Sequence, residues 1–210
     1  MKVLILGATG LVGSHILSMA LSDDRVEKVI APVRKNIDAH PKLFAPIINF
    51  DEITKEEVCS WKCDVVICAL GTTIKKAGSK AAFRRVDLEY PLTFGKLAKE
   101  CAAKSYVLNS AMGANSDSLV FYNKIKGLVE EGLQSLNFDA LTIVRPGLIG
   151  GQRDEFRFAE EIAKRFLRIL GPLLPKRLRL NPAKRIAQTM LESALSDQLG
   201  VKIISSDKLV

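Results

Sequence analysis

The chain has 210 residues, of which 48% are hydrophobic and 26% charged, and its formal net charge is +8. This length suits a single domain, and the composition excludes a disordered or fibrous protein. The four cysteines are too few for a disulfide framework, and they form no metal-binding pattern with the two histidines. We therefore expect no metal site, and four reduced, mostly buried thiols in a cytoplasmic protein.

The excess positive charge comes from one segment, residues 162–191, which contains no acidic residue. Its basic residues are Lys164, Arg165, Arg168, Lys176, Arg177, Arg179, Lys184 and Arg185. Such a segment could bind an acidic protein partner, or it could be the solvated face of a helix. No recognition motif accompanies the charge, so we do not expect nucleic-acid binding. No stretch of eighteen apolar residues occurs, so we expect no membrane span.

The first predicted elements are a strand, a glycine-rich turn and a helix. Val3–Leu6 is a continuous apolar run, and Leu11–Leu21 has helical periodicity. The residues that join them are typical of a dinucleotide-binding turn, in which the backbone amides at the helix N-terminus face a pyrophosphate. The expected cofactor-binding residues here are Gly7, Thr9, Gly10, Leu11, Val12 and Gly13.

Strands and helices alternate along the rest of the chain. Further strands are expected at Lys28–Val33, Ile47–Phe50, Val65–Leu70, Tyr106–Asn109, Leu141–Val144 and Val201–Ile204. Helices are expected at Thr54–Ser60, Leu88–Ala103, Leu119–Leu136, Glu155–Leu170 and Pro182–Ser196. This alternation predicts an α/β fold: a Rossmann-type, doubly wound parallel sheet with helices on both faces. We expect residues 1–147 to form the core, 148–195 a small helical lid, and 196–210 a final strand that returns to the sheet.

The end of the second predicted strand indicates the type of cofactor. An NAD site places an acidic side chain there to bind the ribose 2′-hydroxyl, whereas this strand ends in Arg34 and Lys35. A guanidinium can pair with a 2′-phosphate and stack on adenine, so NADP(H) is favoured over NAD(H). The alternative is that both residues are solvated charges at a strand end.

Two further segments border the predicted cofactor site. Asp51 follows the third predicted strand and could accept a hydrogen bond from the adenine amino group, or it could cap the helix that starts near Thr54. The fourth strand ends in Ala69, Leu70, Gly71 and Thr72. These four residues should lie in the ligand crevice, because ligands bind at the carboxyl edge of a parallel sheet.

Ser110, Tyr122 and Lys126 have a spacing that suits proton transfer beside a nicotinamide. Tyr122 and Lys126 are one helical turn apart, so both side chains lie on one face of the predicted helix. The ammonium would stabilise tyrosinate and reach a ribose hydroxyl, and Ser110 would hold a substrate carbonyl oxygen. The alternative is an ordinary amphipathic helix with Lys126 in solvent.

The chain resembles divergent extended short-chain dehydrogenases/reductases, most closely their Tat-interacting-protein-like branch. The matching segments are residues 7–13, Gly71-Thr72-Thr73, Phe83-Arg84-Arg85-Val86-Asp87, Tyr122-x3-Lys126-Gly127, Phe138-Asp139 and Arg145-Pro146-Gly147. The resemblance implies a Rossmann fold, an NADPH-type cofactor, and Ser110, Tyr122 and Lys126 in the catalytic positions. We also assign Arg145, Pro146 and Gly147 to the cofactor site.

Three functions are compatible with this pattern. The first is an NADPH-dependent oxidoreductase that reduces a small carbonyl compound, with Tyr122 as proton donor. The second is an NAD(P)H-binding regulatory or protein-interaction module with little turnover, and the third is a sugar-nucleotide epimerase-like enzyme, which normally has a larger substrate domain. For an enzyme, Arg153, Phe156 and Arg157 would lie nearest the substrate; alternatively, Phe156 packs in the core and the arginines face water.

Overall fold

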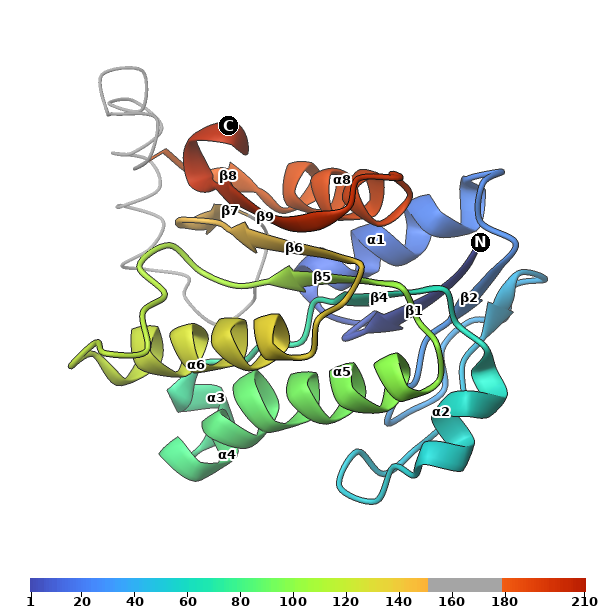
Figure 1. Cartoon of the computed structure of the whole chain (residues 1–210), viewed down its shortest axis with the longest axis horizontal. Helices are drawn as coiled ribbons and strands as arrows, with labels where there is room; N and C mark the ends of the chain where they lie inside the picture. The colour runs from blue at the N-terminus through green and yellow to red at the C-terminus, as the bar shows by residue number, and fades with distance from the viewer. Residues whose placement is uncertain (151–178) are drawn as a thin grey trace.

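The computed structural model describes residues 1–150 and 179–210. In these residues seven strands form one sheet in the order β3-β2-β1-β4-β5-β6-β9, and every neighbouring pair is parallel (Figure 1). The strands are β1 (Lys2–Leu6), β2 (Lys28–Ile30), β3 (Leu43–Phe44), β4 (Val65–Cys68), β5 (Ser105–Asn109), β6 (Ala140–Arg145) and β9 (Gly200–Ser205). The predicted α/β doubly wound parallel sheet is therefore confirmed.

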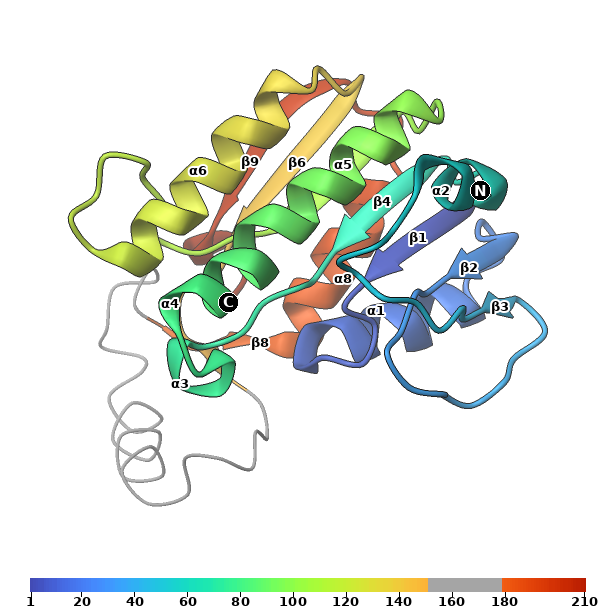
Figure 2. The same ribbon diagram turned by 90° about the horizontal axis from the view of Figure 1, so that it is seen from below.

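Helices cover both faces of the sheet. One face carries α1 (Leu11–Ser22) and α8 (Ala183–Ala194), and the other carries α2 (Lys55–Trp61), α5 (Tyr90–Glu100) and α6 (Phe121–Ser135) (Figures 1 and 2). The central strands are buried on both sides because alternate residues enter two separate apolar clusters. Continuous apolar runs such as Val65–Cys68 are the consequence of this two-sided burial.

Short elements gather at the carboxyl edge of the sheet. The chain leaves β4 into α3 (Ile74–Ala77) and α4 (Lys80–Arg84), and it leaves β6 into β7 (Ile149–Gly150), which pairs with β8 (Asn181–Pro182). Both groups lie beyond the ends of β4, β5 and β6 (Figures 1 and 2). This is the edge at which ligands bind in open α/β sheets.

The predicted strand Ile47–Phe50 is wrong. The third strand is instead Leu43–Phe44, and Ile47 forms only an isolated bridge with Val33. Backbone bonds from Val29, Ala31 and Val33 reach the carbonyls of Lys42, Phe44 and Pro46 in turn. Regular pairing ends early because Pro32 and Pro46 have no N–H to donate, which shortens β2 as well.

The helix predicted at Leu88–Ala103 begins earlier and contains a π-helical turn. The chain is helical through α4, a π-helix η1 (Arg85–Glu89) and α5. Pro91 stands in the first turn of α5 and cannot donate the usual backbone bond, and the wider turn accommodates the missing donor. This turn contains Asp87, which is buried.

The lid predicted over residues 148–195 extends too far toward the C-terminus. Within it, Ala183–Ala194 is α8. Its Ile186, Ala187 and Met190 are buried in the apolar cluster on the face of the sheet that also carries α1. The amphipathic pattern of α8 therefore reflects core packing. The predicted helix Glu155–Leu170 lies outside the described residues. β9 pairs with β6 and closes the sheet on that side.

The expectation of four reduced cysteines is also wrong. Cys59 near the end of α2 and Cys101 just after α5 form a disulfide, with their Cα atoms 4.9 Å apart. The two residues are 42 positions apart in sequence, and the fold brings them together because α2 lies against the end of α5. Cys63 and Cys68 remain free and buried, and burial raises the pKa of the Cys63 thiol to about 11.

Candidate active site at the carboxyl edge of the sheet

The glycine turn after β1 has the geometry of a phosphate cradle. Gly7 has a φ of +81°, a conformation that favours glycine. A Cβ on Gly13 would lie 2.0 Å from the Gly7 carbonyl oxygen, so α1 can pack this closely on the turn only because Gly13 has no side chain. Gly10 caps α1 and has no side chain to bond the first-turn amides of Leu11 and Val12. These amides stand at the positive end of a 12-residue helix, and they fit a pyrophosphate.

Arg34 and Lys35 are exposed just beyond β2, at the same edge as the glycine turn. Asp51 accepts a hydrogen bond from the Tyr90 hydroxyl at 2.9 Å and lies 3.7 Å from the Arg85 guanidinium. Burial, the hydrogen bond to Asp51 and the Asp51 charge raise the pKa of Tyr90, while Arg85 and Arg34 act in the opposite direction. Arg34 is therefore close enough to act electrostatically on the Tyr90–Asp51 pair.

Asp51 does not cap α2. Thr54 does so in a capping box, in which its hydroxyl accepts a bond from the Glu57 amide and the Glu57 carboxylate accepts one from the Thr54 amide. The capping alternative for Asp51 is thus excluded. Its carboxylate remains at the surface between Tyr90 and Arg85.

The end of β4 connects the cofactor edge to the predicted chemical site. Ala69 and Leu70 pack closely on Gly7: a Cβ on Gly7 would lie 2.9 Å from their backbone atoms. Gly71 follows, and the Thr72 amide donates a hydrogen bond to the Asp87 carboxylate at 2.9 Å. The π-helical turn thereby holds the β4 loop in place.

Lys126 is buried and pairs with Asp87. The Lys126 ammonium lies 2.8 Å from the Asp87 carboxylate, and the two residues are only 4% and 1% exposed. Burial acts to lower the pKa of Lys126, but the charge of Asp87, the nearby Tyr122 and a hydrogen bond to Asp87 raise it overall. The site therefore holds a lysine that stays charged, as a group that stabilises tyrosinate must be.

Tyr122 lies in the first turn of α6 and is exposed, with 37% of its surface accessible to solvent. Its ring packs on Phe83 of α4, with 5.7 Å between the centroids. Phe83 also packs on Phe121, so α4 fixes the start of α6. Tyr122 is thus held in place on one side and open on the other, beside Lys126.

The Ser110 hydroxyl points to Glu130, a contact that the sequence did not indicate. Ser110 follows β5 and donates a hydrogen bond to the carboxylate of Glu130, which is 2% exposed. Arg145 at the end of β6 donates from Nε to the same carboxylate at 3.0 Å and pairs with it through Nη2. The hydrogen bond from Arg145 to Glu130 raises the pKa of Arg145.

Arg145 therefore binds Glu130. The next two residues, Pro146 and Gly147, contact the loop after β5 and the strand β8. The Pro146 carbonyl accepts a bond from the Met112 amide at 2.7 Å, and the Gly147 amide donates to the Asn181 side chain at 2.7 Å. Asn181 is fully buried. These contacts tie the chain after β6 to the loop after β5 and to β8. Arg153, Phe156 and Arg157 lie outside the described residues.

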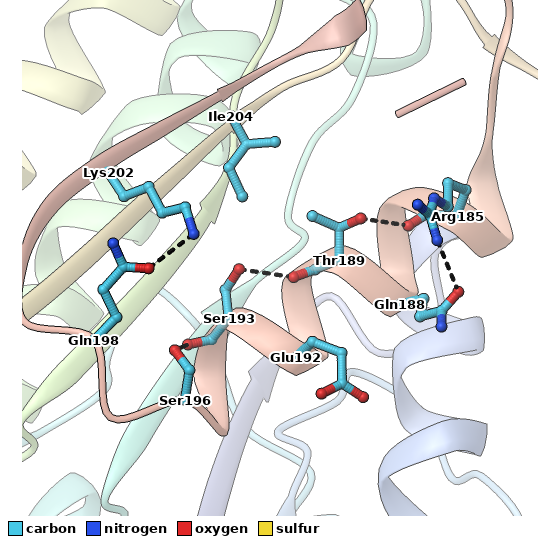
Figure 3. Close-up of a pocket in the computed structure, with 9 residues that line it drawn as sticks. All are labelled: Arg185, Gln188, Thr189, Glu192, Ser193, Ser196, Gln198, Lys202 and Ile204. Carbon is cyan, nitrogen blue, oxygen red and sulfur yellow. Dashed lines mark hydrogen bonds between the residues drawn. The ribbon is translucent and has the colours of Figure 1, made fainter. Parts of the chain in front are cut away.

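A separate groove of about 310 Å³ runs along α8 and the outer strand β9, on the flank of the sheet (Figure 3). Arg185 and Lys202 line it together with Glu192 and several hydroxyl and amide side chains. None of the predicted catalytic or cofactor residues borders it. Within residues 1–150 and 179–210, no group of acidic, cysteine or histidine side chains is arranged to hold a metal ion, and no helix could span a membrane.

Sequence reasoning missed Asp87, Glu130, Arg85 and Tyr90 as site residues. Glu130 could have been found, because Tyr122, Lys126 and Glu130 follow one another at four-residue intervals and so share a face of α6. Asp87 was quoted only within a matching segment, and the π-helical turn that aims it at Lys126 has no reliable sequence signal.

A protein-family model and several curated proteins match this chain. The model of the NAD dependent epimerase/dehydratase family matches residues 3–118. The protein "fmp52, mitochondrial" of Emericella nidulans is 35% identical over 179 residues, which are 81% of this chain and 76% of that protein. "Protein HTATIP2" of Rattus norvegicus is 34% identical over 169 residues, 79% of this chain and 69% of that protein.

Solved structures show the same fold at low sequence identity. UDP-glucuronic acid 4-epimerase from Bacillus cereus, in complex with NAD, has a TM-score of 0.73 at 13% identity, covering 98% of this chain and 77% of that chain. The oxidoreductase ylbE from Lactococcus lactis has a TM-score of 0.69 at 21% identity, covering 97% and 89%. The expected cytoplasmic location is contradicted, because relatives from Emericella nidulans and Candida albicans are named as mitochondrial proteins.

Proposed function

Because this chain belongs to the NAD dependent epimerase/dehydratase family of extended short-chain dehydrogenases/reductases, we propose that it is an NADPH-dependent reductase of a small carbonyl compound. The observation that carries the proposal is the buried Lys126–Asp87 pair beside Tyr122, at 2.8 Å. A buried charged lysine is costly, and here it lies next to Tyr122, whose hydroxyl can donate a proton.

Each residue then has a definite task. The reduced nicotinamide, when bound, supplies a hydride to the carbonyl carbon. Tyr122 donates its hydroxyl proton to the carbonyl oxygen, and Lys126 stabilises the resulting tyrosinate until solvent returns the proton. Asp87 holds Lys126 in position and keeps it charged. Ser110 lies at the end of the neighbouring strand, where it contacts the substrate.

The preference for NADPH rests on the charges around the adenosine end. Arg34 and Lys35 are exposed beyond β2, and neither forms an ion pair with another described residue. Both are therefore available to a 2′-phosphate, with Arg85 nearby at Asp51. Asp51 already accepts a bond from Tyr90, and its second oxygen could still receive the adenine amino group. Tyr90 offers a ring beside the adenine.

The test is a reductase screen with NADPH across aldehydes, ketones, quinones and enones. Turnover is measured as the loss of NADPH absorbance. Lys126→Ala should abolish turnover and weaken NADPH binding. The matched control is Lys124→Ala, because Lys124 lies on the same helix but is exposed. Unchanged turnover in Lys126→Ala, or equal losses in both variants, would overturn the assignment. The names of the relatives also favour a mitochondrial location for this chain, which cell fractionation can check.

A further inference from the structure

The direction of the Ser110 hydrogen bond limits what this residue can offer to a substrate. Arg145 holds Glu130 through two of its nitrogens, so Glu130 is a carboxylate that can only accept hydrogen bonds. The single hydroxyl proton of Ser110 is therefore committed to Glu130. What remains on Ser110 Oγ is a pair of acceptor sites, and no other described residue donates to them.

The surroundings keep Ser110 in this orientation. Ser110 and Glu130 are only 4% and 2% exposed, so water cannot readily compete for the carboxylate. Turning the hydroxyl proton toward the substrate would leave a buried carboxylate oxygen with one donor fewer, a change that is unfavourable. The neighbouring Asn109 Oδ1 is also buried without a donor among the described residues, so the end of β5 is rich in acceptors.

We propose that Glu130 fixes Ser110 as a hydrogen-bond acceptor, and that the site therefore selects carbonyl compounds that carry a neighbouring hydroxyl group. Tyr122 donates to the carbonyl oxygen, and the substrate hydroxyl donates to Ser110 Oγ. In the reaction the carbonyl carbon receives a hydride from reduced nicotinamide, and the carbonyl oxygen receives the Tyr122 proton. The product is a vicinal diol, the neighbouring hydroxyl is unchanged, and solvent reprotonates Tyr122.

This inference rests on the proposed reductase activity but makes a narrower claim. Glu130 and Arg145 do not touch the substrate in it; they are positioning residues that act through Ser110. A plain ketone offers no donor to Ser110, so its binding leaves a buried acceptor unsatisfied. The expected penalty is about tenfold in kcat/KM.

The experiment compares three probes that differ only beside the carbonyl: a 2-hydroxy ketone, its 2-methoxy ether and the unsubstituted ketone. The wild-type protein should prefer the hydroxy ketone about tenfold over both others. In Glu130→Gln the side-chain amide can donate a hydrogen bond to Ser110, which frees the serine proton to face the substrate. The preference for the hydroxy ketone over the other two probes should therefore fall to about unity. Ser110→Ala should remove it as well, and this variant leaves the Glu130–Arg145 pair intact if Glu130→Gln does not fold.

The matched control is Glu131→Gln. Glu131 is the next residue of α6 and likewise accepts a hydrogen bond from a serine, Ser116, but Glu131 is exposed and forms no contact with Ser110 in the described residues. This variant should retain the full wild-type preference. A loss of preference in Glu131→Gln equal to that in Glu130→Gln would overturn the role of the Ser110–Glu130 contact.

A binding measurement separates this inference from the proposed activity. Protein saturated with NADP⁺ is titrated with the diol and with its monomethyl ether, followed by calorimetry. Tighter binding of the diol, lost in Ser110→Ala, supports the inference even if no reductase turnover is found. Reduction of all three ketones at equal efficiency, with equal binding of diol and ether, would overturn the inference and leave the reductase assignment standing.

Discussion

At the scale of single residues, the buried Asp87–Lys126 pair should have a large effect on stability. Asp87→Asn retains an acceptor for the Thr72 amide but leaves Lys126 buried beside a neutral group. We expect this variant to lose about 3–5 kcal/mol of stability in urea unfolding. Asp139→Asn is the control, because its pair with Lys99 is 3.1 Å long but half-exposed, and its loss should cost under about 1 kcal/mol.

The pH dependence of this penalty has a definite sign. In the wild type the folded-state pKa of Lys126 is raised, so the contribution of the pair is fully present below the ordinary lysine value and is lost only as the pH rises through the folded-state pKa. In Asp87→Asn, burial acts without the opposing charge and the pKa falls. The penalty should therefore shrink as the pH is raised from about 7 toward about 10. A penalty that grows over this range would contradict the pairing.

Arg34 allows a second test at this scale. Arg34→Ala should weaken NADPH binding by about 1.5–3 kcal/mol, because it removes a charge-assisted contact to the 2′-phosphate, and should change NADH binding little. Fluorescence titration of both cofactors measures the difference. Lys28→Ala, which removes an exposed cation at the opposite end of β2, serves as the control. Equal affinity of the wild type for NADPH and NADH would refute the cofactor preference.

At the scale of elements, Gly127 determines how closely α6 approaches the loop after β5. A Cβ at Gly127 would lie 2.0 Å from the Ser116 amide nitrogen, whereas one at Gly132 would meet only the end of the Leu92 side chain at 2.6 Å. Gly127→Ala should therefore cost at least about 1–3 kcal/mol and displace the helix that carries Tyr122. Gly132→Ala should cost less, since a flexible side chain can move. Thermal unfolding and NADPH turnover of both variants test this prediction. Equal losses of stability in Gly127→Ala and Gly132→Ala would contradict it.

Strands and helices with a strong hydrophobic pattern could be predicted from the sequence. Elements whose boundaries depend on a proline could not. The runs that became β1 and β4 are continuous and apolar because both faces of these strands are buried, and this pattern is visible in the sequence. The third strand was misplaced because Pro32 and Pro46 lack the N–H that would continue the ladder, so regular pairing is limited to Leu43–Phe44. The π-helical turn at Asp87 and the burial of α8 under the sheet depend on tertiary contacts that one sequence does not display.

The same distinction applies to the candidate site. The glycine turn and the Tyr122–Lys126 spacing follow local rules, and the structure places these residues at one edge of the sheet. Asp87 and Arg145 approach α6 from other elements, so their contacts with Lys126 and Glu130 could not be read from spacing. The candidate site therefore combines local motifs with contacts between residues that are distant in the chain.

At the scale of the whole molecule, the Cys59–Cys101 disulfide should contribute to stability. It joins residues 42 positions apart, and closing such a loop in the unfolded chain is worth about 4 kcal/mol in the chain-entropy model. Reduction should therefore lower the melting temperature of the wild type. The Cys59→Ser/Cys101→Ser double variant should melt at the lower temperature with or without reductant. A wild type that is insensitive to reductant would contradict the crosslink.

We propose that this protein transfers a hydride from NADPH to a carbonyl carbon, with Tyr122 as the proton donor. The most direct measurement uses NADPH deuterated at the transferred position, the carbonyl panel as acceptors, and mass spectrometry of the products. The wild type should place one deuterium on the former carbonyl carbon, and Tyr122→Phe, saturated with the same cofactor, should place none while still binding NADPH. Equal labelling by both proteins, or no labelling by the wild type, would contradict the account.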